Sequence, residues 1–540
     1  MYQYVVIVLV SIIFVGTSST RNIFLLDGIE RKYAYFNKSE LEDAREMAKE
    51  MFYFGWENYL MHAFPDDEID PIHCTGRSAD HMNPSNININ DVLGDYSLTL
   101  IDTLDSLVVF GDQDEFKRAV RLVIENVDFD KNTTVQVFES TIRVIGGLLS
   151  AHLIATDESR VLGDFYLEAY EGELLTLAQD LCDRLIVAFD NTMTEIPFTR
   201  VNLQKGVLPE TVTSTCTAGA GSLLLEFGIL SALVEDSKYG DVARKANHAL
   251  WSKRNPTTGL LGNLIDIQTG EWLGHLSGLG AGLDSYFELM LKSYVLFGQE
   301  NDLKMFNEAF ESIMKHMRRG RKTCLDSQGE SPLFVNASLA GVLVLAGRVD
   351  EAVCQHAIYY AIWKKYGVLP ERYNWKTRTP DVNFYPLRPE FAESTYLLYS
   401  ATKNPFYQKV GLEIMDNIDR LTRVECGFAT VHDVHDGSLE DRMESFFLAE
   451  TMKYLYLLFD TDHPVNRNQE KIVFSTEGHI FPVSRRFRTR KSTLTEPQWT
   501  NSSCEAAPKF NVGAPPLKRV QIAQIFNEIG VQPNPWDSFN

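Results

Sequence analysis

Two kinds of helical segment alternate along this chain, and this alternation constrains the fold more than any other feature. One kind is apolar on all sides, as in residues 137–153, 222–233 and 445–458. The other kind has one apolar and one charged side, as in residues 238–251 and 301–318. A helix that is apolar all round must be buried, whereas an amphipathic helix covers a core. The pattern therefore predicts an all-α fold of two concentric rings, with a two-domain helical bundle as the competing architecture.

Hydrophobic periodicity predicts helices along most of the chain and only short strands, such as residues 471–475. Ser39 and Glu42 have the spacing of a capping box and predict the start of the first helix. Gly367 and Pro370 predict the end of another helix. The expected helices cover residues 97–111, 114–127, 135–155, 166–188, 216–234, 239–252, 283–297, 301–318, 351–366, 389–402, 405–421 and 441–459.

The N-terminus is typical of a secretory signal peptide covering residues 1–19. Residues 4–16 are apolar apart from Ser11, and small residues follow for cleavage. This run is short for a membrane span, and no other run of spanning length is expected; an uncleaved anchor is the alternative, because no Lys or Arg precedes the run. Four Asn-X-Ser/Thr sequons fit a secretory-pathway protein with glycans at Asn37, Asn132, Asn336 and Asn501.

The composition indicates a large folded protein and excludes some partners. The chain has 540 residues, of which 44% are hydrophobic, and this is enough for a sizeable core. The net charge of −22 argues against nucleic acids and anionic membranes as main partners. It is compatible with a neutral polar substrate or with cations.

The seven cysteines are widely spaced and include no Cys-X-X-Cys pair. This pattern indicates neither a zinc framework nor a small disulfide-rich fold. An odd number requires at least one free thiol or one intermolecular bond. Cys182 and Cys354 lie in apolar helices, so both are expected to be buried thiols.

Acidic residues recur on the apolar helices. Glu390 and Glu393 are three residues apart, on one face of a helix that begins at Pro389. A single buried acid is usually explained by a structural salt bridge. Acids on most of the inner helices instead predict a polar axial cavity lined with carboxylates, and carboxylate pairs are the groups that glycoside hydrolysis uses. The other acids of this kind are Asp102, Asp105, Glu139, Glu226, Asp284 and Glu444.

Five acid-bearing stretches make the sequence recognisable. They are Phe-Glu-Ser-Thr-Ile-Arg (138–143), Gly-Ala-Gly-Leu-Asp-Ser-Tyr (280–286), Leu-Arg-Pro-Glu-Phe-Ala-Glu-Ser (387–394), Arg-Met-Glu-Ser-Phe-Phe-Leu (442–448) and Phe-Ser-Thr-Glu (474–477). In these stretches the chain resembles the class I α-1,2-mannosidases, glycoside hydrolase family 47. Within that family it is most similar to the ER degradation-enhancing α-mannosidase-like proteins.

The resemblance implies an (α/α)7 barrel and inverting hydrolysis of terminal α-1,2-linked mannose in the ER lumen. Glu139 would be the general acid, Glu390 the general base, and Asp284 the third catalytic carboxylate. A Ca²⁺ ion would bind Thr476 directly and Glu477 through water, since oxygen-rich, hydrated coordination suits this metal. The residues expected to contact substrate are Arg143, Glu226, Arg388, Glu393 and Glu444.

The implied partners are misfolded N-glycosylated proteins, which the protein would direct to degradation, and an ER thiol oxidoreductase. No nucleic acid and no membrane span after signal cleavage are expected. The alternative function is a protein of the same fold that binds glycans or misfolded chains without turnover.

The expected organisation is a signal peptide (1–19), a linker (20–38), the barrel (39–482) and a flexible tail (483–540). The basic run at residues 485–491 is expected to be a solvated linker. The resembled family has a longer inner helix where this chain has only residues 338–347. We therefore expect a barrel that is incomplete near residues 336–354, with Leu343, Val344 and Leu345 poorly covered. This shortening favours the binding alternative.

Overall fold

The computed structural model describes residues 36–317, 337–374 and 377–488. The expected signal peptide, most of the expected linker, the tail beyond residue 488 and two sequons, Asn336 and Asn501, lie outside the described residues. The sequons that can be placed, Asn37 and Asn132, are both exposed.

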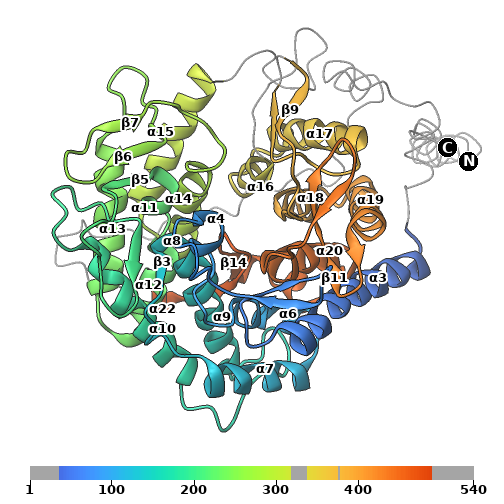
Figure 1. The fold of residues 1–540 in the computed structure, drawn as a ribbon. Helices are drawn as coiled ribbons and strands as arrows, with labels where there is room; N and C mark the ends of the chain where they lie inside the picture. The colour runs from blue at the N-terminus through green and yellow to red at the C-terminus, as the bar shows by residue number, and fades with distance from the viewer. Residues whose placement is uncertain (1–35, 318–336, 375–376, 489–540) are drawn as a thin grey trace, which may run out of the picture.

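Helices form two rings in the described part of the chain (Figure 1). The seven inner segments are α5–α6 (Leu98–Asp102, Leu104–Val109), α8–η2–α9 (Val137–Glu139, Ser140–Ile145, Gly146–Ala155), α11–α12 (Thr217–Gly221, Leu224–Val234), α14 (Asp284–Phe297), α16 (Ser338–Leu345), α18 (Glu390–Thr402) and η4–α20 (Phe447–Thr451, Met452–Phe459). The seven outer helices are α3 (Lys38–Asn58), α7 (Gln113–Asn126), α10 (Glu173–Leu185), α13 (Lys238–Ser252), α15 (Glu300–His316), α17 (Val349–Tyr366) and α19 (Pro405–Thr422). Each inner segment contacts the next, and α20 closes the ring against α6 and α3. The predicted (α/α)7 barrel is confirmed.

Burial of the apolar residues separates the two rings. In outer helix α7, Phe116, Ala119, Val120 and Val123 are buried on one side, which is the spacing of an amphipathic helix. In inner helix α12 nearly every side chain is buried, and each buried Leu, Ile or Phe stabilises the fold by about 1.5–3 kcal/mol. The hydrophobic core therefore lies between the two rings and includes nearly all side chains of the inner helices.

Two inner segments, Val137–Ala155 and Thr217–Val234, are long and apolar enough to span a membrane. The expectation that no run beyond the N-terminus reaches that length is therefore wrong. In both segments 83% of the apolar window is buried inside the structure. Their composition is thus explained by their place in the barrel.

The first helix begins earlier than the sequence predicted. Asn37 is the N-cap of α3: its side chain accepts a hydrogen bond from the Glu40 backbone N–H at 3.0 Å. The Glu40 carboxylate accepts one from the Asn37 N–H at 2.8 Å. The capping box predicted for Ser39 and Glu42 is wrong, because Asn is an equally good cap and Glu40 stands three residues after it.

The expected short inner helix is present, but the ring is closed around it. Helix α16 has 8 residues, compared with 14 in α14, and it contacts α14, α17 and α18. Gly341 allows α18 to approach, and its N–H donates a hydrogen bond to Ser394 Oγ at 3.1 Å. Leu343 and Val344 are 1% and 8% exposed, so the expectation that they are poorly covered is wrong; Leu345 is 42% exposed.

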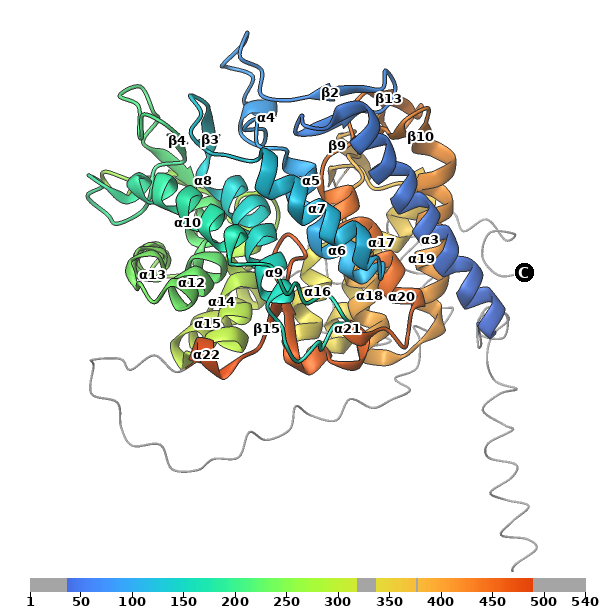
Figure 2. The same cartoon turned by 90° about the horizontal axis from the view of Figure 1, so that it is seen from below.

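Short antiparallel strands lie in the connections between the helices. Most of them lie at one end of the barrel, whereas β15 lies at the other (Figure 2). The sheets are β1–β2 (Glu68–Asp70, Thr75–Arg77), β3–β4 (Thr134–Gln136, Arg200–Asn202), β5–β6–β7 (Ser214–Cys216, Leu264–Asp266, Trp272–Gly274), β8–β9 (Arg372–Asn374, Thr379–Val382), β10–β11 (Arg423–Val424, Gly427–Phe428), β12–β13 (Thr430–Asp433, Ser438–Glu440) and β14–β15 (Ile472–Phe474, Ile480–Pro482). The last hairpin brings residues 475–479 to the inside of the inner ring.

The cysteines are partly as predicted. Cys74 and Cys426 form a disulfide that joins the β1–β2 and β10–β11 connections. Cys182 is a buried free thiol, as predicted, and Cys216 is also free. Cys354 is disulfide-bonded, so its expected state as a free thiol is wrong: burial in an apolar helix is compatible with either state.

Ordered structure continues past residue 482. Helix α22 (Arg485–Arg488) packs against α12 and α14, and Phe487 is buried. The Arg486 guanidinium donates a hydrogen bond to Leu233 O at 3.3 Å, at the carboxyl end of α12, where cations are favourable. Residues 485–488, the first part of the basic run that was expected to be a solvated linker, therefore belong to the barrel.

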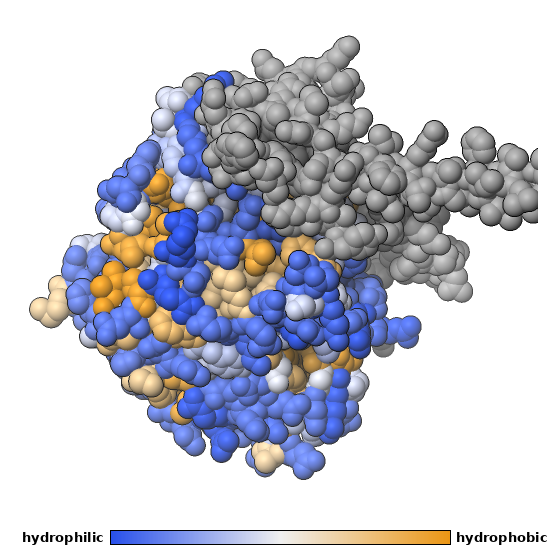
Figure 3. Space-filling model, turned by 90° about the vertical axis from the view of Figure 1, so that its right-hand side faces the viewer, coloured by the Kyte–Doolittle hydropathy of each residue, from blue (hydrophilic) through white to orange (hydrophobic). Residues whose placement is uncertain are grey.

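The remaining short helices are η1 (Tyr59–Ala63), α4 (Ile87–Asn90), η3 (Ile186–Phe189), α21 (Pro464–Arg467) and η5 (Gln469–Lys471). The face of the molecule in Figure 3 is mostly hydrophilic with scattered apolar areas. The large exposed apolar side chains in the described part, such as Met61, Met82, Met193 and Leu276, are likewise spread over several elements.

Candidate functional site

The three predicted catalytic carboxylates stand at the beginnings of inner segments. Glu139 ends the single turn α8 and precedes the π-helical turn η2, whereas Asp284 and Glu390 are the first residues of α14 and α18. Because an outer helix returns the chain after each inner one, the inner helices run in the same direction and their N-terminal ends meet at one end of the barrel. Helix N-termini favour negative charge. All three residues remain partly exposed and can be reached by a ligand.

Arg143 and Phe446 connect the Glu139 side of the site with the Glu390 side. Arg143 Nε donates to Glu139 Oε2 at 2.9 Å, and the same guanidinium forms an ion pair with Glu477. The Phe446 ring lies 5.4 Å from the guanidinium carbon of Arg143 and 5.7 Å from that of Arg388. A buried aromatic ring between two cations is held by cation–π attraction and keeps the two guanidinium groups apart.

Glu371 fixes the orientation of Arg388. The Arg388 guanidinium donates two hydrogen bonds to the Glu371 carboxylate, at 2.5 and 2.8 Å. Leu387 has a left-handed backbone (φ 66°), which costs a non-glycine residue about 1–2 kcal/mol, and Thr451 Oγ1 donates to its carbonyl at 2.8 Å. Strained backbone of this kind is typical of functional sites.

The carboxylates at the mouth affect one another. Burial raises the pKa of Glu390, and the Arg388 guanidinium opposes the shift. Burial also raises the pKa of Asp284, which Glu288 raises further and Arg388 lowers. Arg388 therefore acts on both carboxyls and helps to keep them ionised near neutral pH.

The floor of the site is the loop of the β14–β15 hairpin. Lys292 Nζ donates to Ser475 O at 3.0 Å, and Lys453 Nζ donates to Gly478 O at 2.7 Å. His479 lies between two acids: its Nε2 is 3.2 Å from Asp102 Oδ1, and its Nδ1 is 3.4 Å from Asp105 Oδ2. These buried contacts explain Asp102 and Asp105 as structural residues that hold the loop on the barrel axis.

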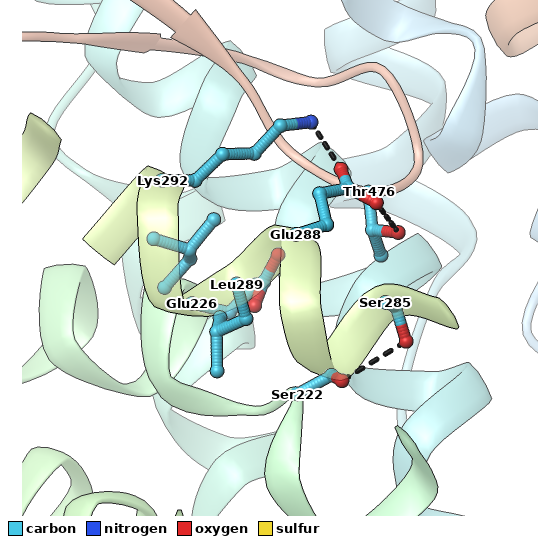
Figure 4. Close-up of a pocket in the computed structure, with 8 residues that line it drawn as sticks. Ser222, Glu226, Ser285, Glu288, Leu289, Lys292 and Thr476 are labelled. Carbon is cyan, nitrogen blue, oxygen red and sulfur yellow. Dashed lines mark hydrogen bonds and ion pairs between the residues drawn. The ribbon is translucent and has the colours of Figure 1, made fainter. Parts of the chain in front are cut away.

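A small cavity lies beside this loop (Figure 4). Its lining includes Ser222, Glu226, Ser285, Glu288, Lys292 and Thr476. Thr476 Oγ1 donates to Glu288 Oε2 at 3.1 Å, and Glu288 forms an ion pair with Lys292. Glu226 is 1% exposed, and neither of its carboxylate oxygens has a hydrogen-bond partner in the described residues.

The residues of the floor fit a hydrated cation. Burial raises the pKa of Glu226 to about 8, and burial likewise raises that of Glu393 to about 8 although Lys292 opposes it. Buried carboxylates of this kind are stabilised by a nearby cation. In the described ranges no group of three or more His, Cys, Asp or Glu side chains is arranged to hold a metal directly. The donor set therefore fits a Ca²⁺ ion bound to the oxygens of Thr476 and to water molecules. The carboxylates would accept hydrogen bonds from those waters.

Several residues of the site were not predicted. Glu288, Lys292 and Glu450 are buried inner-helix residues, and Glu288 stands one turn after Asp284, which was a usable signal. Arg442 Nε lies 2.9 Å from Glu68 Oε2, and Arg442 Nη1 lies 3.5 Å from Oε1 of the predicted substrate residue Glu444. Glu371 lies outside the helices, and no pattern in the sequence links it to Arg388.

The helical toroid gathers carboxylates at one end of its inner ring, and carboxylate pairs are the groups that glycoside hydrolysis uses. The family model for Glycosyl hydrolase family 47 matches residues 51–483. The chain belongs to this family.

Relatives and a solved structure agree with this assignment. The chain is 45% identical to ER degradation-enhancing alpha-mannosidase-like protein 1 of Schizosaccharomyces pombe, over 85% of this chain and 58% of the relative. It is 42% identical to alpha-mannosidase I MNS4 of Arabidopsis thaliana, over 82% of this chain and 70% of the relative. An alpha-1,2-mannosidase from Trichoderma reesei superposes with a TM-score of 0.70 and 24% identity, over 82% of this chain and 99% of that one, and shows the same fold.

The chain spans only part of several relatives. It covers 58% of the S. pombe protein and 52% of ER degradation-enhancing alpha-mannosidase-like protein 3 of Xenopus laevis, to which it is 42% identical over 86% of its own length.

Proposed function

We propose that this protein removes terminal α-1,2-linked mannose from N-glycans of misfolded glycoproteins in the ER lumen and thereby directs them to degradation. The observation that carries the proposal is the meeting of Glu139, Asp284 and Glu390 at one end of the barrel, with Arg143 and Arg388 oriented beside them. The names of the relatives, ER degradation-enhancing alpha-mannosidase-like proteins, support the substrate class and the compartment.

Hydrolysis would proceed with inversion at the anomeric carbon. Glu390 accepts a proton from the attacking water, and Glu139 is the general acid that protonates the leaving oxygen, with Asp284 as the third carboxylate beside them. An acid and a base in an inverting site are roughly 6.5–9.5 Å apart, which leaves room for the water.

Ca²⁺ at the floor, bound when present by Thr476 and by waters held by Glu226, Glu393 and Glu477, would supply positive charge that orients sugar hydroxyls. The chain's own residues hold the loop and the carboxylates of the site in place. Lys292 and Lys453 hold the loop that carries Thr476, and Arg143 holds both Glu139 and Glu477.

The test is mannose release from a high-mannose glycoprotein, measured with and without chelator. We expect free mannose in the presence of Ca²⁺ and a loss of release after chelation. A folded protein that binds the glycan but releases no mannose in Ca²⁺ would favour the second candidate, a binding protein without turnover. The short inner helix α16 is the sequence feature that suggested this candidate, and the ring is closed around it.

A further inference from the structure

Three buried polar groups that lack a hydrogen-bond partner in the described part of the chain form a stripe on α17. Gln355, Tyr359 and Trp363 are 1%, 8% and 1% exposed. Gln355 Oε1, the Tyr359 hydroxyl and Trp363 Nε1 have no hydrogen-bond partner among the described residues. Because the residues are four apart, they lie on one side of the helix. Buried polar groups in proteins are nearly always satisfied, by water where protein offers no partner.

Helix α17 packs on the start of α18 through the residues on either side of Tyr359. His356 Nε2 lies 2.8 Å from Thr395 Oγ1, and its ring stacks on Phe391 with centroids 4.9 Å apart. One turn further along α17 than Tyr359, the Trp363 ring packs on the same Phe391 at 5.6 Å. Tyr359 thus stands between two residues that both contact Phe391, the residue immediately after Glu390.

Tyr360, the next residue of α17, is a tyrosine whose hydroxyl does have a hydrogen-bond partner. Tyr360 follows Tyr359, but its hydroxyl donates to Glu413 Oε2 of α19 at 2.9 Å. Burial raises the pKa of the Tyr359 hydroxyl, and Glu390 is the charged group that raises it further. The two neighbouring tyrosines therefore have different surroundings: Tyr360 contacts Glu413 of α19, whereas Tyr359 experiences the charge of Glu390 at the start of α18.

We propose that Tyr359 is a positioning residue for Glu390: its hydroxyl donates to ordered water that the Glu390 carboxylate shares, and Gln355 and Trp363 bind further water along α17. The inference rests on the proposed role of Glu390 as the base. Ordered water beside a base fixes the carboxylate's orientation and keeps one lone pair free for the attacking water.

The kinetic test compares two matched variants on mannose release. Tyr359→Phe removes only the hydroxyl, and we expect kcat to fall about fivefold to tenfold, the value of one hydrogen bond, with KM unchanged. Tyr360→Phe is the control, with the same atom removed from the same helix, and its kcat should stay within about twofold of wild type. Equal kcat values for wild type and Tyr359→Phe would overturn the proposal.

A stability cycle tests the proposal without relying on activity. Each tyrosine variant is made alone and together with Glu390→Gln, and melting temperatures are compared. We expect the shift caused by Tyr359→Phe to differ by about one degree between the two backgrounds, whereas that of Tyr360→Phe is the same in both. Equal shifts for Tyr359→Phe would refute the coupling. If wild type released no mannose, the proposed function would fail, but this cycle would still decide on the contact.

Crystallography covers the case in which Tyr359→Phe does not fold. A wild-type structure at high resolution should show a water within hydrogen-bond distance of both the Tyr359 hydroxyl and the Glu390 carboxylate. Clear density for both side chains with no water between them would contradict the proposal.

Discussion

Lys453→Met should destabilise the barrel strongly, because it removes the closest cation from the buried Asp105 carboxylate and leaves only His479 to offset that charge. Lys453 and Asp105 are both fully buried, and Lys453 Nζ lies 2.6 Å from Asp105 Oδ1 and 2.7 Å from Gly478 O. Breaking a buried ion pair on one side costs about 3–5 kcal/mol. For a barrel of roughly 430 residues the unfolding entropy is about 0.9 kcal/mol/K, so the melting temperature should fall by about 3–6 °C.

Scanning calorimetry with two comparison variants makes this test specific. Lys364→Met removes a pair at the surface, where Lys364 Nζ and Glu413 Oε2 are 3.4 Å apart and both side chains are about a quarter exposed; such pairs contribute up to about 1 kcal/mol. Combining Lys453→Met with Asp105→Asn removes both charges and should restore part of the lost stability. The reasoning is refuted if Lys453→Met melts like Lys364→Met, or if the double variant is less stable than the single one.

Three further predictions follow from the structure. Burial lowers the pKa of His356 to about 3. Its contribution to the free energy of unfolding is therefore fully present above the unfolded pKa of about 6.5 and falls by about 2 kcal/mol between pH 7 and pH 5. In calorimetry His356→Gln should flatten this pH dependence, and parallel pH profiles of wild type and variant would contradict it. Chelation should lower the melting temperature, because a ligand that binds only the native state stabilises it; a metal-free sample that melts like the Ca²⁺-loaded one would remove Thr476 from the metal site. NMR of freshly released sugar should show β-mannose first, and α-mannose would rule out inversion.

The sequence predicted the barrel well because its two ring types differ in their hydrophobic pattern. Inner segments such as Thr217–Val234 are apolar on all sides, whereas α7 has a single apolar side, and both patterns arise directly from burial. The predicted catalytic residues Glu139, Asp284 and Glu390 do lie at one end of the ring. Their position follows from two facts that the sequence carries, namely that acids begin the inner helices and that these helices run in the same direction.

What the sequence could not predict depends on contacts between distant segments. Glu371 meets Arg388 through a loop, and Lys453 meets Asp105 where α20 closes the ring against α6, so no spacing reveals either pair. The covering of Leu343 was missed for a similar reason. The length of α16 alone suggested an opening, but the missing side chain of Gly341 lets α18 pack closely against it.

Mannose release by wild type and by Glu390→Gln tests the central claim most directly. Gln keeps the shape of the side chain but cannot take the proton of the attacking water. Both proteins would be compared at equal concentration on one high-mannose glycoprotein in Ca²⁺, after equal melting temperatures to within about two degrees have shown that both are folded. We predict that wild type releases mannose and that the variant is slower by at least about 100-fold. Equal release by the two proteins would contradict the assignment of the base, and no release by either would contradict the proposed activity.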